Sequence, residues 1–229
     1  MKTSAVSMAA LLALTGVASA QVTYNDAAMD LFDNGFAHLD ILSVTVSHDA
    51  TDLYFTITTR GDVSNPNWGK FCVGIDGPGG VNDAGNGWGR PINWNGQGID
   101  FWVGTWADNN GGGFGGELRG MDGSGGNVLI DATYTTGTLI NGTSTVTQNI
   151  RVSRAPMGLL DGMTFYFDVL SSGGGGGDPG VDHLSRNDPA TPDWSVPSVA
   201  GAFLPYTIPT PGALALLGLG GLLVARRRR

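Results

Sequence analysis

Short segments of alternating apolar and polar residues, separated by turn-forming residues, constrain the fold more than any other feature of this sequence. In residues 53–59, Leu53, Phe55 and Ile57 alternate with Tyr and Thr. Successive side chains of a strand point to opposite faces, so this pattern predicts a half-buried strand. Residues 41–47 are rich in β-branched side chains and precede a turn-like stretch, so the two segments are predicted to form a hairpin.

Further strands are expected along the body, which contains no convincing helix of ten residues. They are residues 71–76, 99–106, 128–134, 143–153 and 163–170. Glu117 is the single glutamate among 20 acidic residues, and lysine is scarce, whereas Gly, Thr, Asp and aromatic residues abound. This composition is typical of strands and turns. The sequence therefore predicts an all-β chain, a single antiparallel, jelly-roll-like β-sandwich of about eight strands.

Glycine is concentrated in the segments between these strands. Residues 61–126 contain 21 glycines, far above the average of about 7%, but aromatic residues are interleaved with them. Disordered segments are usually poor in aromatics, so 77–89 and 111–126 are predicted to be long ordered loops around a binding or ion-holding edge. The five consecutive glycines at 173–177 predict a flexible surface loop.

The N-terminal 20 residues have the pattern of a secretory signal peptide. Lys2 precedes an apolar run at 5–17, and Ala18 and Ala20 fit the small-x-small pattern that signal peptidase cleaves. Cleavage would leave Gln21 as the mature N-terminus. The alternative is an N-terminal membrane anchor, for which the run is short.

The C-terminus combines a Pro-x-Pro motif, an apolar run without charges and an arginine cluster. The apolar run covers the 14 residues 212–225, which reach only about 21 Å as a helix, short of a hydrocarbon core of roughly 30 Å. The arginines would stay in the cytoplasm and leave the body outside. The flanking residues are Pro209, Thr210, Pro211, Arg226, Arg227, Arg228 and Arg229.

These features together resemble the PEP-CTERM sorting signal of bacterial exported proteins, with Thr210 in place of the usual Glu. The resemblance implies processing by an exosortase, transient membrane contact through a short C-terminal apolar helix, and delivery to the cell envelope, surface or extracellular matrix of a bacterium. A plain C-terminal transmembrane helix is the alternative. The expected organisation is a signal peptide (1–20), an exported domain (21–208) and a sorting tail (209–229).

Charge and cysteine content narrow the function of the exported domain. Its flanks carry five of the 12 basic residues and none of the 20 acidic ones, so the domain has a net charge of −13. Binding to nucleic acid or to anionic lipid is therefore disfavoured. The single cysteine, Cys72, excludes an intramolecular disulfide, and its apolar neighbours predict a buried, inert thiol.

The body is similar to family 9 carbohydrate-binding modules and the related DOMON-like sandwiches. The similarity rests on Asp40-Ile41 at the start of a strand, the hairpin ending in 53–57, the strand 73–76 and the strand 100–103. It implies a sandwich that binds sugars or, in some branches, haem, and that often holds structural calcium. A haem site would need an axial Met or His pair, and the histidine spacing here does not favour one.

Two tryptophan clusters are the candidate ligand site. In the strand 99–106, Asp100, Trp102 and Trp106 share the face opposite the core, with the indoles roughly 13 Å apart. Flat aromatic surfaces and flanking carboxylates suit a saccharide platform; alternatively, a loop covers this face and the indoles complete the packing. The second cluster is Trp88, Arg90 and Trp94, which supplies stacking surfaces and donors, unless Arg90 pairs with an acid and the indoles pin a loop.

The remaining polar residues bear on calcium binding and on catalysis. Asp76, Asn82, Asp83 and Asn86 could converge on calcium, and a second calcium position is conceivable around Asp178 and Asp182. Asp and Asn in turns also occur without a metal. No zinc helix motif, Gly-x-Ser-x-Gly elbow or phosphate-binding loop is present, and Asp182-His183 is the one pair that invites a structural check. Three functions remain open: a non-catalytic binder of carbohydrate or matrix polysaccharide, a purely structural matrix protein, and a secreted hydrolase.

Overall fold

The computed structural model describes residues 21–107, 115–132, 135–137 and 146–210. The expected signal peptide and residues 211–229 of the expected sorting tail lie outside the described residues. Within the described residues the chain forms 14 strands and a 3-10 helix, η2 (Ala155–Met157). The strands are β1 (Gln21–Asn25), β2 (Ile41–His48), β3 (Asp52–Thr59), β4 (Lys70–Asp76), β5 (Ile92–Asn93), β6 (Phe101–Trp106), β7 (Gly115–Met121), β8 (Asn127–Asp131), β9 (Thr135–Gly137), β10 (Thr147–Ser153), β11 (Thr164–Ser172), β12 (Gly180–His183), β13 (Ser198–Val199) and β14 (Leu204–Thr207).

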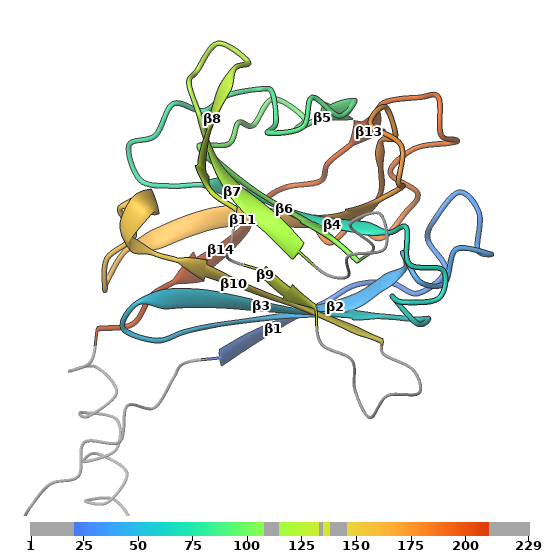
Figure 1. Ribbon diagram of the computed structural model, residues 1–229, viewed down its shortest axis with the longest axis horizontal. Helices are drawn as coiled ribbons and strands as arrows, with labels where there is room; N and C mark the ends of the chain where they lie inside the picture. Colours follow the sequence, from blue (N-terminus) through green and yellow to red (C-terminus); the bar gives the residue numbers. More distant parts are fainter. Residues whose placement is uncertain (1–20, 108–114, 133–134, 138–145, 211–229) are drawn as a thin grey trace, which may run out of the picture. The chain divides into compact units, whose positions relative to one another are not determined.

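Two antiparallel sheets form a β-sandwich, which confirms the predicted fold class. One sheet has the order β1-β2-β3-β10-β9. The other has the order β12-β11-β4-β6-β7-β8, and β14 also pairs with β11. Figure 1 shows the sheets as two stacked layers. The expected hairpin is the pair β2 and β3, in which Val46 lies opposite Phe55.

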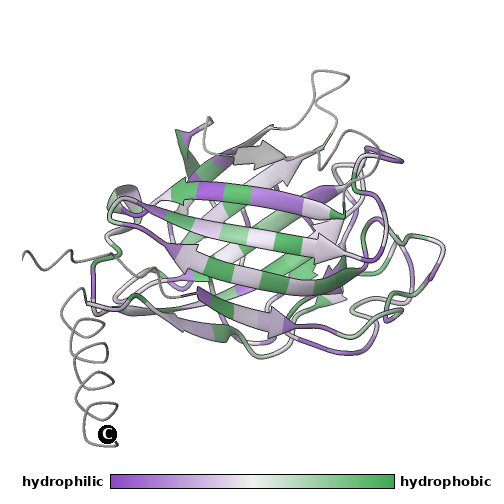
Figure 2. Cartoon of the chain, turned by 90° about the horizontal axis from the view of Figure 1, so that it is seen from below, coloured by the Kyte–Doolittle hydropathy of each residue, from purple (hydrophilic) through white to green (hydrophobic). Residues whose placement is uncertain are grey.

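The core between the sheets follows the alternation of the sequence. Leu53, Phe55 and Ile57 of β3 are fully buried and belong to one cluster with Phe71 and Val73 of β4. Each such side chain contributes about 1.5–3 kcal/mol relative to its exposed state. Figure 2 shows the resulting bands of hydrophobic and hydrophilic residues along the strands.

The seven-stranded sheet is buried on its outer face as well. Cys72 and Trp102 point away from the sandwich core and belong to a second buried cluster with Trp94 and Ile99. This cluster lies beneath the loops that carry β5 and β13, which pair in parallel and lie above the sheet in Figure 1. The predicted burial of Cys72 is confirmed, and this burial raises the pKa of its thiol to about 12.

The strand count differs from the expected eight mainly because several strands are short or rich in glycine. The prediction that 111–126 is entirely loop is wrong, because β7 occupies Gly115–Met121. The glycine has a packing role there: a Cβ on Gly115 would lie 2.7 Å from Nε1 of Trp106 on the neighbouring strand. The bulky indole on β6 therefore requires a residue without a side chain on β7.

Candidate functional site

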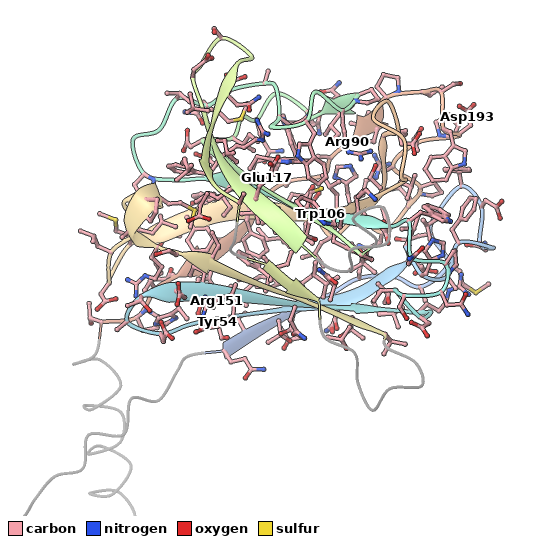
Figure 3. The ribbon with its side chains drawn as sticks, in the orientation of Figure 1. Tyr54, Arg90, Trp106, Glu117, Arg151 and Asp193 are labelled. Carbon is pink, nitrogen blue, oxygen red and sulfur yellow. The ribbon has the colours of Figure 1, made fainter. Side chains whose placement is uncertain are left out.

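The outer face of β6 is covered rather than open. Trp102 is fully buried, and Trp88 fills the space over Gly104, where a Cβ would lie 2.3 Å from the Trp88 ring. The centroid of the Trp88 ring lies 5.8 Å from that of Trp102 and 6.3 Å from that of Trp106. Trp88 also donates from Nε1 to Glu117, which Figure 3 places beside Trp106. The prediction of an open saccharide platform on β6 is therefore wrong, and the alternative in which a loop covers it is correct.

Asp100 and Trp94 are also buried, and they fix the covering loop. The Asp100 carboxylate accepts hydrogen bonds from the backbone N–H groups of Gly77 (2.6 Å) and Asn82 (3.0 Å). Trp94 donates from Nε1 to the carbonyl of Gly85 at 2.9 Å. Their polar atoms are used within the protein, which leaves them unsuited to contact a ligand from solvent.

The residues predicted for calcium have different surroundings. Both carboxylate oxygens of Asp83 accept backbone hydrogen bonds, from Gly85 at 2.7 Å and Gly125 at 2.8 Å. Asp76 and Asn82 instead line a cavity of about 550 Å³. Burial, followed by the nearby Asp100, raises the pKa of Asp76. Calcium binding by these residues stays a prediction without support from their geometry.

Arg90 organises the run of five glycines. Its Nη1 donates to Ser172 Oγ (2.7 Å) and to the carbonyls of Gly175 and Asp178 (both 3.0 Å). Its Nη2 donates to the carbonyl of Gly173 at 3.2 Å. Figure 3 places Arg90 within the loop layer above the seven-stranded sheet. The glycine run is therefore held by a buried guanidinium, in contrast to the prediction of a flexible loop, and Arg90 pairs with carbonyls instead of an acid.

The glycine run forms part of a different site, here called the aromatic cleft and defined by Phe36, Trp68, Gly174, Asp178 and Trp194. These residues line a cavity of about 360 Å³, the size of a small-molecule site. The three aromatic residues are only half-buried. The Trp194 centroid lies 5.3 Å from that of Phe36 and 6.1 Å from that of Trp68.

The walls of the aromatic cleft come from loops that are distant in sequence. Phe36 lies between β1 and β2, Trp68 just before β4, and Trp194 between β12 and β13. They pack on a small cluster formed by Leu31, Leu39 and Val181. Sequence reasoning missed this site because no local pattern relates the three positions. A Trp among turn-forming residues, as at Trp68 and Trp194, was the one available signal.

The aromatic cleft combines ring surfaces with one carboxylate. Asp178 Oδ2 accepts a hydrogen bond from the Gly175 backbone at 2.8 Å, while its Oδ1 accepts none from the described residues. A Cβ on Gly173 would lie 2.0 Å from Asp178 Oδ2 and 2.8 Å from the Trp194 ring. The absence of a side chain at Gly173 therefore lets Asp178 and Trp194 approach the backbone closely. Stacking surface next to an acceptor suits a polyol ligand.

His183 belongs to a sealed hydrogen-bond chain. Its Nδ1 lies 2.7 Å from Asp168 Oδ2, and its Nε2 lies 3.1 Å from Ser198 Oγ. All three side chains are fully buried, and a Cβ on Gly180 would lie 2.4 Å from Nε2. Asp182 is not the partner of His183, because adjacent strand residues face opposite sides. The three side chains are connected in the order Asp-His-Ser, as in a catalytic triad. Because all three are buried, the arrangement gives no positive sign of catalysis.

No family model, curated protein or solved structure matches this chain. Across the described residues, no helix has the length and apolar character needed to cross a membrane.

Proposed function

We propose that this chain is an exported, non-catalytic β-sandwich protein that binds carbohydrate or extracellular matrix polysaccharide in the aromatic cleft. The observation that carries the proposal is that the half-buried rings of Trp68 and Trp194 line one cavity together with Gly174 and Asp178. Aromatic rings stack on the apolar faces of sugars, and a carboxylate accepts hydrogen bonds from hydroxyls. The net charge of −13 favours a neutral polymer over an anionic one.

The proposed route to the cell surface uses both ends of the chain. Signal peptidase would cleave before Gln21, an exosortase would process the tail, and the protein would be delivered to the envelope or extracellular matrix.

Affinity electrophoresis of the full-length protein in gels containing soluble polysaccharides tests the proposed binding. A ligand polysaccharide should retard the wild type, and Trp194→Ala or Trp68→Ala should weaken binding by about 30-fold, equivalent to about 2 kcal/mol. Tyr166→Ala is the matched control, because Tyr166 is 47% exposed and lies outside the aromatic cleft. Equal retardation of wild type and cleft variants would refute the site.

A purely structural role in the matrix is the second candidate function. The complete burial of Trp102 and the filling of the β6 face by Trp88 favour it, because the most conspicuous tryptophans of the sequence serve packing. Failure of every neutral polysaccharide to retard the folded wild type would support this candidate.

A further inference from the structure

Three carboxylates meet where the loop after β1 contacts β12. Asp26, Asp30 and Asp182 each place one carboxylate oxygen within 4.8 Å of the others. Asp30 is 8% exposed and Asp182 is 2% exposed, so the group lies largely inside the protein. Two oxygen ligands on opposite sides of one calcium ion are separated by about 4.6–5.2 Å, twice the calcium–oxygen distance. The spacing therefore fits ligands of a single ion.

The hydrogen bonding of this group is incomplete. Within the part of the chain that the structure describes, neither carboxylate oxygen of the buried Asp30, nor Oδ2 of Asp26, has a hydrogen-bond partner. Asp26 Oδ1 accepts a bond from the Ala27 backbone at 2.9 Å, and Asp182 Oδ2 accepts one from the Ile41 backbone at 2.6 Å. Buried carboxylate oxygens are nearly always hydrogen-bonded or bound to a metal. The unpaired oxygens of Asp30 therefore indicate a ligand-binding position.

The neighbouring cations are engaged elsewhere. Arg60 donates from Nε to Asp40 at 2.5 Å, and Arg186 forms an ion pair with Asp188 at 2.5 Å. The negative charge of Asp26, Asp30 and Asp182 is thus left without a paired cation among the described residues.

The pKa values of the three carboxyl groups are raised by their burial and by nearby negative charges. Burial, followed by the charge of Asp30, raises the pKa of Asp26 to about 8. Burial and the nearby Asp40 raise the pKa of Asp30 to about 6. Burial and the charges of Asp26 and Asp30 raise the pKa of Asp182 well above its ordinary value. Three ionised carboxylates at this spacing would repel one another strongly unless a cation lay between them.

We propose that Asp26, Asp30 and Asp182 bind a divalent cation, and that the cation is calcium. All the side-chain ligands are oxygens, which calcium prefers, and calcium accepts an irregular set completed by backbone carbonyls and water. Magnesium requires near-ideal octahedral geometry at about 2.1 Å and usually keeps several waters, which suits three largely buried carboxylates less well.

The cation would tie the loop 26–40 to β12. This loop also carries Phe36, one wall of the aromatic cleft, and Leu31 and Leu39, which pack with Val181 of β12. Bound calcium is therefore expected to hold that wall in place. This last consequence rests on the proposed carbohydrate function, whereas the cation site itself does not.

Thermal unfolding of the full-length, chelator-stripped protein with calcium chloride tests the site. At a calcium concentration 100-fold above Kd, the midpoint should rise by about 5–10 °C. Asp30→Asn should abolish this rise and should raise the midpoint of the calcium-free protein, since it removes a repelling charge while keeping the shape of the side chain. Asp26→Asn should behave likewise.

Asp33→Asn is the matched control, because Asp33 lies in the same loop but is exposed. It should keep the full calcium response. A wild type without a calcium-dependent shift, or an Asp30→Asn variant that keeps the full shift, would overturn the site. If calcium raises the unfolding midpoint but no polysaccharide retards the protein, the cation site stands and only the proposed carbohydrate function is contradicted. If a polysaccharide is bound but calcium does not change the midpoint, the carbohydrate function stands and the cation site is contradicted.

Discussion

Replacing Arg90 with Met is expected to destabilise the protein and to release the glycine run at 173–177. Methionine keeps much of the apolar stem of arginine but removes every donor. Four hydrogen bonds would be lost, those to Ser172 Oγ and to the carbonyls of Gly173, Gly175 and Asp178. The carbonyls would then need new partners.

The magnitude follows from the number and burial of these bonds. A hydrogen bond from a charged donor contributes about 1.5 kcal/mol or more. Because Nη1 has two hydrogens for its three acceptors, the four contacts count as about three full bonds and sum to about 4.5 kcal/mol before relaxation. Because the glycine run lies at the surface, water can replace the arginine at some carbonyls. We therefore expect the free energy of unfolding to fall by about 3–5 kcal/mol, a large value for one substitution.

Urea unfolding measures the loss of stability, and hydrogen–deuterium exchange of residues 173–178 measures the release of the loop. Arg151→Met is the matched control, since Arg151 is exposed on the outer face of the five-stranded sheet (Figure 3). The control should change stability by no more than about 0.5 kcal/mol. If Arg90→Met matched the control and the loop amides exchanged at the wild-type rate, the structural role of Arg90 would be refuted.

Three further predictions concern other parts of the fold. Gly180→Ala should cost about 1–3 kcal/mol in urea unfolding, because the new methyl group would collide with the His183 ring; an unchanged midpoint would show that the ring moves freely. Cys72 should react with thiol reagents only after unfolding, since it is fully buried with a raised pKa, and rapid labelling of the native protein would contradict that burial. Hydrogen bonds from the Tyr54 hydroxyl and from the backbone of Thr51 hold the pKa of Asp49 below its usual range. The ionised Asp49 therefore stabilises the folded protein fully above about pH 4, and this contribution is lost as the pH falls through the lowered pKa. Asp49→Asn should therefore reduce the fall in melting temperature between about pH 4 and pH 2, and an identical acid limb in wild type and variant would contradict this reasoning.

The sequence determined the class of fold and the placement of the core strands. The alternation of residues 53–59 identified β3 and its buried face, because the period of a strand is a local property of the chain. The apolar surroundings of Cys72 identified its burial for the same reason. The strand β7 was missed because its Gly115 makes room for the Trp106 ring on the neighbouring strand, a requirement that no local pattern expresses.

The tertiary structure decided which side chains meet and which remain exposed. Trp88 and Trp102, prominent in sequence, pack on each other, while Phe36, Trp68 and Trp194 come together from three separate loops to line a cleft. Likewise Asp182, which the sequence grouped with Asp178, lies beside Asp26 and Asp30, which are distant in the sequence. Exposure and ligand convergence depend on contacts between distant segments, so they are set only when the sheets and their covering loops are assembled.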